Sequence, residues 1–433
     1  MIIHTVKQGD TVYSIARQYS VPATRIITDN MLMNPGRLAV GEDLVILFPT
    51  QTHTVRGGET LSGIASLYGV SLLSLYQNNP QLGGNPGIFP GQVLNISYET
   101  PPLGSIRTNG YAYTNIDRSV LRRTLPYLTY LSVFNYGIAK DGTLLPPPGN
   151  DDELISIARE YGTVPLLVLT SLTENGTFSS DRAALVLENP ELQAQVIAST
   201  VDTVRTKGYG GVDVDFEYIP AASAESYVAF ITRMQEALGE DGTVFVSLAP
   251  KYNADQRGLL YEGHDYGGLG AAADAVLAMT YEWGYTYGPP RAVSPLPEVR
   301  RVLEYALTEI PGDKIFMGVP NYGYDWPLPY IAGETKAQSL GNTAAVERAL
   351  QKNTAIEYDE TDQAPFYRYF DRPESYSDAV EHEVWFENAR SVDAQLRLVR
   401  ELGLRGIGVW NIMRYFPALW LVLHQLYSIE KLS

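Results

Sequence analysis

The chain has 433 residues, of which 45% are hydrophobic and 19% are charged, and its formal net charge at pH 7 is -17. This length allows two or three domains with a sizeable core. The excess of acidic residues argues against nucleic-acid binding, which needs basic side chains to neutralise phosphates, and against an electrostatic membrane anchor. A neutral or polar partner, such as a carbohydrate, is left open.

Two features of the composition limit the kinds of catalysis and metal site that this chain can have. The chain contains no cysteine, which excludes disulfides and thiol catalysis. Its five histidines are scattered, so we predict neither a metal site nor a cofactor. The N-terminal sequence lacks a basic stretch followed by an apolar run, and the most apolar C-terminal stretch is too short to span a bilayer. We therefore expect synthesis in the cytoplasm without a signal peptide, no membrane partner, and a monomer.

The first hundred residues contain an internal repeat. Residues 4–21, HTVKQGDTVYSIARQYSV, return at 53–70 as HTVRGGETLSGIASLYGV. Two copies predict two small modules, residues 1–49 and 50–98, rather than a solenoid, which needs three or more repeats. Each copy predicts the order strand, helix, helix, strand, with Thr11 and Thr60 as the N-caps of the first helices.

These repeats resemble LysM modules. The residues that carry the resemblance are the stretches VKQGDTVYSIA and VRGGETLSGIA, the NNP turn, and the endings GEDLVI and GQVLNI. It implies binding of polymers that contain N-acetylglucosamine, which are peptidoglycan or chitin. The alternative is a pair of structural units without a ligand.

A proline-containing linker at 99–107 precedes one large domain, 108–433. Apolar strand-like runs alternate there with helical stretches and are counted as eight, near 110, 128, 164, 210, 243, 275, 314 and 406. This alternation predicts an α/β fold, a (β/α)₈ TIM barrel. Ser223 is expected to cap the helix after the fourth strand. The Tyr-rich and Pro-rich interval at about 324–388 is too long for one helix and predicts a small α+β insertion beside the barrel's C-terminal face.

The stretch GYGGVDVDFEYIP at 208–220 places Asp213, Asp215 and Glu217 at alternate positions of the fourth strand. Alternate residues of a strand share a face, so all three carboxylates should point into the barrel. Stacked carboxylates raise one another's pKa, which favours Glu217, the last of the row, as a proton donor. The alternative, a solvated acidic face, does not suit a strand flanked by valine and phenylalanine in a barrel pattern.

This row resembles the signature Asp-x-x-Asp-x-Asp-x-Glu of the family-18 glycoside hydrolases, and the resemblance extends over nearly the whole C-terminal domain. The first Asp of the signature falls on Gly210 and is absent. We expect this loss to change how Asp213 is held rather than to abolish the chemistry.

Further positions match the same family, and the resemblance implies their roles. Met279, Tyr281 and Glu282 occupy the end of strand six, where the family has Met-x-Tyr-Asp, so Glu282 replaces an aspartate. Trp410 takes the place of the tryptophan floor of the sugar subsite. The remaining candidates for substrate contact are Asn321, Tyr322 and Asn135, of which Asn135 is equally consistent with a polar core position.

The resemblance implies a retaining, substrate-assisted mechanism. Glu217 acts as general acid and base, the 2-acetamido group of the substrate attacks, and Asp215 and Tyr281 orient that group, with Asp213 as electrostatic support. Among relatives, the arrangement is most similar to the spore-germination N-acetylglucosaminidases, which act on cortex peptidoglycan. That similarity implies a location in the spore coat and cortex region, or otherwise at the cell wall. The alternatives are a chitinase and a non-catalytic glycan-binding spore-coat protein.

Overall fold

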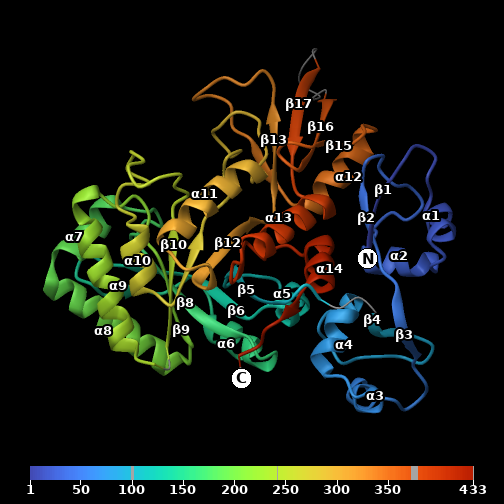
Figure 1. Ribbon diagram of the computed structural model, residues 1–433, viewed down its shortest axis with the longest axis horizontal. Helices are drawn as coiled ribbons and strands as arrows, with labels where there is room; N and C mark the ends of the chain where they lie inside the picture. Colours follow the sequence, from blue (N-terminus) through green and yellow to red (C-terminus); the bar gives the residue numbers. More distant parts are fainter. Residues whose placement is uncertain (99–101, 241, 372–378, 433) are drawn as a thin grey trace.

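The computed structural model describes residues 1–98, 102–240, 242–371 and 379–432. The start of the expected linker, 99–101, and part of the expected insertion, 372–378, lie outside the described residues. Figure 1 shows a barrel with a small sheet at one end and two small modules along one side.

Both modules have the expected order of elements. The first contains β1 (Ile2–Thr5), α1 (Val12–Tyr19), α2 (Ala23–Asp29) and β2 (Asp43–Ile46). The second contains β3 (Pro49–Thr54), α3 (Leu61–Tyr68), α4 (Leu72–Asn78), the 3₁₀ turn η1 (Pro80–Leu82) and β4 (Val93–Tyr98). In each, the first and last strands pair antiparallel.

The predicted caps are confirmed. Thr11 accepts a hydrogen bond from the Ser14 amide at 3.0 Å, and Thr60 accepts one from the Gly63 amide at 3.1 Å. A threonine oxygen at this position satisfies one of the amide groups that the first helical turn leaves without a partner.

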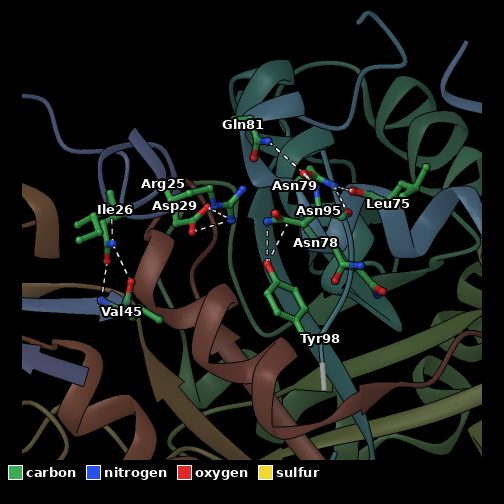
Figure 2. A network of polar contacts seen from close by, with 12 residues as sticks. Arg25, Ile26, Asp29, Val45, Leu75, Asn78, Asn79, Gln81, Asn95 and Tyr98 are labelled. Atoms are coloured by element: carbon green, nitrogen blue, oxygen red, sulfur yellow. Dashed lines mark hydrogen bonds and ion pairs between the residues drawn. The ribbon is translucent and has the colours of Figure 1, made fainter. Parts of the chain in front are cut away.

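An asparagine joins the second helix of each module to its last strand; Asn30 is half-buried, and Asn79, which Figure 2 shows, is buried. Asn79 donates to the carbonyls of Leu75 and Asn95 at 2.9 and 2.8 Å and accepts from the Asn95 amide at 2.8 Å. Asn30 makes the same three bonds with Ile26 and Val45. The two modules therefore share this set of three hydrogen bonds as well as their repeated sequence.

The expected (β/α)₈ barrel is confirmed. Its eight strands form a parallel sheet that the pairing of β5 with β6 closes. In order around the barrel they are β5 (Ser105–Tyr113), β6 (Tyr130–Ile138), β8 (Val164–Thr170), β9 (Gly211–Asp215), β10 (Thr243–Leu248), β11 (Ala275–Ala278), β12 (Ile315–Pro320) and β18 (Gly406–Trp410). Two short strands, β7 (Leu144–Leu145) and β19 (Ser428–Ile429), extend it.

Helices and 3₁₀ turns connect the strands (Figure 1). They are α5 (Arg118–Thr124), η2 (Leu125–Tyr127), α6 (Asp151–Glu160), α7 (Ser180–Glu188), α8 (Pro190–Lys207), η3 (Ala221–Ser223), α9 (Ala224–Leu238), α10 (Tyr266–Ala272), α11 (Leu296–Glu309), η4 (Gly312–Lys314), α13 (Ala389–Glu401) and α14 (Pro417–Leu426). None of the helices within the described ranges combines the length and the apolar character that crossing a bilayer requires.

The prediction that Ser223 caps α9 is wrong. Ser223 ends the 3₁₀ turn η3 and makes no cap, and its hydroxyl donates instead to Glu188 at 2.7 Å. The turn that follows Pro220 brings the chain into the helix directly, which leaves the serine side chain free to bond α7.

Between β12 and α13 lies a five-stranded antiparallel sheet with one helix. Its elements are β13 (Gly323–Pro327), β14 (Gln338–Leu340), α12 (Asn342–Lys352), β15 (Glu357–Asp359), β16 (Ala364–Asp371) and β17 (Val380–Trp385). α12 packs on this sheet through Ala345 and Ala349, which are fully buried beside Tyr367.

The two modules contact the rest of the chain differently. Module 1 packs on α12, α13 and α14. The Asn388 side chain donates a hydrogen bond from its Nδ2 to the Asp43 carboxylate at 2.5 Å. Module 2 packs on η2 and α14, where Gln77 donates to the Pro126 carbonyl and His424 bonds Asn78, both at 2.8 Å. Module 1 therefore lies beside the insertion at one rim of the barrel (Figure 1).

Candidate active site

β9 brings two of the predicted acids into the barrel. Asp213 and Asp215 are buried on its inner face, whereas Val212 and Val214 pack outward in the main hydrophobic core. β9 ends at Asp215, so Glu217 lies just beyond the strand, half-buried at the C-terminal rim. The alternation expected from the sequence holds, and the row rises from the closed interior to the open end of the barrel.

Three polar side chains from the first two strands hold Asp213. Its Oδ2 accepts hydrogen bonds from Tyr111 at 2.7 Å, from Ser132 at 2.8 Å and from Asn109 at 3.5 Å. Burial raises its pKa, and these donors oppose that rise because they stabilise the carboxylate. Asp213 is thus fixed in place at the bottom of the row.

The other two acids are held less tightly and have more strongly raised pKa values. Burial raises the pKa of Asp215 well above its usual value, and the charges of Glu217 and Asp213 add to the effect. Burial also raises the pKa of Glu217 to about 7, with Glu282 contributing. The expected mutual effect of the stacked carboxylates is therefore present at Asp215, and burial is the first cause of the raised pKa at every position of the row.

One oxygen of each aspartate is left without a partner. Oδ1 of Asp213 and Oδ1 of Asp215 are buried and make no hydrogen bond with any residue that the structure describes. A buried carboxylate oxygen without a donor is costly, which makes it available to a proton or to an N–H group of a ligand.

Tyr281 lies beside the row at the end of β11. Burial raises its pKa well above the usual value, with Asp215 and Glu217 as the next causes, so the phenol stays protonated and can donate. Gly318 of β12 makes room for its ring, because a Cβ there would lie 2.7 Å from Tyr281 Cε1. Met279 is half-buried in the inner aromatic cluster and supports this end of the strand.

Tyr322, just before β13, and Tyr324, within it, hold Glu282 by hydrogen bonds. Tyr322 donates to its Oε1, and Tyr324 donates to the two carboxylate oxygens at 3.0 and 3.3 Å. Desolvation raises the pKa of Glu282, and these bonds oppose it. Glu282 has a left-handed backbone with φ of 68°. Left-handed non-glycine residues cost free energy and gather at functional sites.

Trp410 forms the floor of the cleft together with other aromatic rings. It makes edge contacts with Phe134, Tyr111 and Tyr113, at centroid distances of 5.0, 5.6 and 6.3 Å. Trp410 remains partly exposed. A partly exposed aromatic at the end of a barrel strand offers a stacking face for a sugar ring.

The two candidate asparagines have different surroundings. The Asn321 side-chain amide donates to the carbonyls of Asn411 and Arg414 at 2.9 and 2.8 Å, so both its hydrogens are used by the backbone. Asn135 is half-buried and donates to Thr170 at 3.2 Å, next to Asp215 in the strand register. Asn135 therefore lies near the acid row, and Asn321 primarily shapes the loop after β18.

A pocket of ≈ 360 Å³ opens beside Trp410, and we call it the Trp410 pocket. It brings together four predicted residues with five that the sequence did not single out. They are Glu282, Asn321, Tyr322 and Trp410, and Tyr324, Ser339, Asn411, Met413 and Arg414. Within the described ranges, no group of three or more His, Asp or Glu side chains is placed to hold a metal ion.

Gly210, where the signature acid is missing, has no room for a side chain. A Cβ there would lie 2.3 Å from Val164 Cγ1, and the Gly210 amide donates to the Pro165 carbonyl at 2.8 Å. Val164 fills the space at the bottom of the barrel, so this chain has adapted to the glycine locally.

Sequence reasoning missed the residues that hold the acids. Tyr111 and Asn109 alternate on β5, and Ser132 and Phe134 alternate on β6, so each pair faces inward. Polar residues at period two on otherwise apolar barrel strands are the signal that would have found them. Tyr324 offered no such signal, because its partner Glu282 lies 42 positions earlier in the chain.

Comparison with known proteins gives consistent matches. The model of the family described as glycosyl hydrolases family 18 matches residues 168–414, and that of the LysM domain matches residues 4–47 and 53–97. The chain is 38% identical to the cortical fragment-lytic enzyme of Bacillus subtilis (strain 168), over 100% of this chain and 99% of that protein. It is 35% identical to the cortical fragment-lytic enzyme of Bacillus anthracis, over 99% of both.

Among solved structures, the spore cortex-lytic enzyme SleL of Bacillus megaterium QM B1551 superposes with a TM-score of 0.83 at 38% identity. The match covers 100% of this chain and 99% of that one. These matches confirm both resemblances inferred from the sequence.

Proposed function

The chain belongs to glycosyl hydrolase family 18 and carries two LysM domains, and from this premise we propose that it is an N-acetylglucosaminidase acting on the peptidoglycan of the spore cortex. It would cleave the β-1,4 bond after N-acetylglucosamine. The names of the cortex-lytic relatives and the expected ligands of the LysM domains support this polymer. The same relatives support a location in the spore coat and cortex region.

The observation that carries the proposal is the state of Glu217. Its carboxyl lies at the open end of the row, and its pKa is raised to about 7, so a large fraction is protonated near neutral pH. A general acid works best when its pKa lies near the working pH. A protonated carboxyl beside an aromatic floor is what glycosidic cleavage needs.

In the first step, Glu217 gives its proton to the glycosidic oxygen as the bond to the anomeric carbon breaks. The carbonyl oxygen of the substrate's own 2-acetamido group attacks that carbon and forms an oxazolinium intermediate, as in the substrate-assisted exceptions among glycosidases. Asp215, with its unpartnered buried oxygen, accepts the acetamido N–H and stabilises the developing positive charge. Tyr281 donates to the acetamido oxygen.

In the second step, the Glu217 carboxylate removes a proton from water, which attacks the anomeric carbon and opens the oxazolinium ring. Two inversions give net retention of configuration. Asp213, held by Tyr111 and Ser132, lies below Asp215 in the row and supports it throughout. Trp410 and Met279 bound the sugar, Glu282 and Tyr322 line the neighbouring pocket, and Asn135 and Asn321 shape the rim.

Mass spectrometry of digested cortex fragments tests the proposal. We expect products that end in reducing N-acetylglucosamine, and none from the Glu217→Gln variant. Glu225→Gln, at an exposed position of α9, is the matched control and should digest like the unaltered enzyme. Products ending in reducing muramic residues would overturn the bond assignment. Turnover of chito-oligosaccharides with unchanged cortex fragments would favour a chitinase, and binding without hydrolysis would favour a non-catalytic glycan-binding protein.

A further inference from the structure

The segment that carries Glu217 lies beyond the strand pairing of the barrel. The register of β9 with β8 ends at Asp215, and its register with β10 ends at Val214. Further along, Tyr218 has a left-handed backbone with φ of 57°. Neighbouring strands therefore do not set the direction of the Glu217 side chain, although misplacing a catalytic group by about 1 Å costs about 10²-fold in rate.

The loop before α10 packs against this segment. A Cβ on Gly263 would lie 2.3 Å from Ile219 Cβ and 2.4 Å from the Ile219 carbonyl oxygen. Gly263 and Ile219 are buried, and so is His264, the next residue of the loop. The glycine therefore brings the main chain of the loop into direct contact with the main chain that follows Glu217.

Hydrogen bonds hold His264 in a fixed position within the loop. The Ala249 amide donates to His264 Nδ1 at 3.3 Å, and Lys251 Nζ donates to the His264 carbonyl at 3.0 Å. The Lys251 amide donates to the Tyr266 hydroxyl at 3.1 Å, and that hydroxyl donates to the Ala249 carbonyl at 2.5 Å. The end of β10, the loop and the start of α10 thus form one bonded unit around the imidazole.

These bonds determine which ring nitrogen of His264 carries the proton. Burial lowers the pKa of His264 to about 4, with the charge of Lys251 adding to the effect, so the ring is neutral near pH 7. A nitrogen that accepts from an amide carries no hydrogen, so the hydrogen of the neutral ring is on Nε2. This donor is buried and makes no hydrogen bond of ordinary geometry with any residue that the structure describes.

The donor faces the main chain of Phe216, which joins Asp215 to Glu217. A hydrogen bond with that main chain opposes the lowered pKa of His264, as an acceptor carbonyl does. Burial and the charge of Asp215 raise the pKa of Tyr227, and a hydrogen bond with the same main chain opposes that rise, as an N–H donor does. Tyr227 stacks on the Phe216 ring at 5.7 Å and meets the His264 ring edge-on at 6.0 Å. Phe216 is therefore held by its ring and by both of its peptide groups.

We propose that His264 is a positioning residue for the general acid. Its Nε2–H donates to the carbonyl of Phe216, which belongs to the peptide bond joining Phe216 to Glu217. On the other side of Glu217, Gly263 contacts Ile219. The loop before α10 thus fixes the main chain on both sides of Glu217 and, with it, the direction of the carboxyl group. This role rests on the proposed function, because it needs Glu217 as the proton donor.

Two substrates separate positioning of the acid from general damage to the site. Cortex fragments need a proton on the leaving sugar oxygen. The 2,4-dinitrophenyl β-glycoside of a cortex disaccharide ending in N-acetylglucosamine releases a phenolate, which needs none. His264→Asn keeps an acceptor for the Ala249 amide and loses Nε2–H. It should lower kcat/KM about 10- to 100-fold on cortex fragments and less than about threefold on the dinitrophenyl glycoside. Equal losses on both substrates, or no loss, would overturn the proposal.

A second substitution tests the donor itself. The amide nitrogen of glutamine can reach the position of Nε2, so His264→Gln should recover most of the rate on cortex fragments that His264→Asn loses. Equal impairment of the two variants would contradict a role for Nε2–H. His424→Asn is the matched control. Burial lowers the pKa of His424 to about 4 as well, but this histidine bonds Asn78 of module 2 at 2.8 Å. The control should turn over both substrates normally.

A third variant changes the main-chain contact. Gly263→Ala adds a methyl group against Ile219 and should displace the segment that carries Glu217, with the same substrate-dependent loss. Gly267→Ala, in the first turn of α10, is the control, because the nearest atom to a Cβ there is Glu309 Oε2 at an ordinary 3.4 Å. Melting temperatures establish that both variants are folded. A normal rate of Gly263→Ala on cortex fragments would contradict the proposal.

Glu217→Gln, measured with the same two substrates, separates this role from the proposed function. It should lose turnover of cortex fragments and keep most of its kcat/KM on the dinitrophenyl glycoside. If Glu217→Gln hydrolyses cortex fragments like the unaltered enzyme, the proposed function fails. If Glu217→Gln shows the expected difference and His264→Asn does not, only the positioning role of His264 fails.

Discussion

Two groups of buried or half-buried acids in this molecule have raised pKa values and different surroundings. One is the row Asp213, Asp215 and Glu217 in the barrel. The other, which we call the seam acids, is Glu42, Asp43 and Glu387 between module 1 and α13. Burial is the first cause of the raised pKa in both, to about 7 for Glu217 and Glu42 and about 8 for Glu387.

The difference lies in what each group faces. Among the seam acids, Asp43 accepts from Thr5 and Asn388, both at 2.5 Å, and Glu42 accepts from the Ala39 amide at 3.1 Å. An unpartnered oxygen does not separate the groups, because Glu387 Oε1 also lacks a partner among the described residues. The row instead ends at an open barrel rim beside Trp410. A raised pKa therefore shows only that an acid is removed from water. The position at the open end of a barrel strand is what indicates a catalytic role.

The largest expected effect separates the two groups by activity. Glu217→Gln should lower kcat on cortex fragments by about 10²- to 10⁴-fold, the usual contribution of a general acid. Glu387→Gln should leave the rate within about twofold. Steady-state assays of reducing ends measure both, and a comparable loss in Glu387→Gln would break the distinction.

The next largest expected effect on activity concerns the hydrogen bonds that hold Asp213. Tyr111→Phe removes the 2.7 Å hydrogen bond to Asp213 and leaves Ser132 in place. We expect kcat to fall about tenfold, corresponding to one charged hydrogen bond, with KM nearly unchanged. A changed KM with an unaltered kcat would show that Tyr111 contacts substrate rather than positions Asp213.

A smaller effect should appear in the pH profile. Glu217 must be protonated in the first step, so kcat/KM should fall as the pH rises through about 7. Glu282→Gln removes a negative charge that raises the pKa of Glu217, and the basic limb should therefore move to lower pH. If the basic limb of the kcat/KM profile stays at the same pH in this variant, the charge of Glu282 does not raise the pKa of Glu217.

The smallest effect belongs to the seam acids. The folded protein raises the pKa of Glu387 from 4.5 to about 8, so it binds more protons than the unfolded chain between these values, and this group makes stability fall as the pH rises. Glu387→Gln should melt near the unaltered protein at pH 5 and a few degrees above it at pH 8. Equal melting temperatures at both pH values would contradict a buried ionisable Glu387.

Local patterns in the sequence were sufficient for much of this structure. The internal repeat predicted two modules, Thr11 and Thr60 predicted their helix starts, and the period-two row on β9 predicted which acids face inward. These features depend on neighbouring residues, so alternation and capping rules apply directly.

The features that the sequence did not provide depend on contacts across the fold. The donors to Asp213 come from β5 and β6, about a hundred positions earlier in the chain. The Asn321 amide is used by carbonyls of the loop after β18, and Arg414 reaches α12 only because the insertion folds over the rim. Ser223 failed as a cap because a 3₁₀ turn intervenes.

The account depends most on the claim that the substrate's acetamido group, and not an enzyme carboxylate, attacks the anomeric carbon while Glu217 transfers protons. Proton NMR of the first products of cortex-fragment digestion tests this most directly. We predict that the β anomer of the new reducing N-acetylglucosamine appears first, and that fragments de-N-acetylated at the cleaved sugar are not hydrolysed. Initial formation of the α anomer, or hydrolysis of the de-N-acetylated fragments, would contradict it.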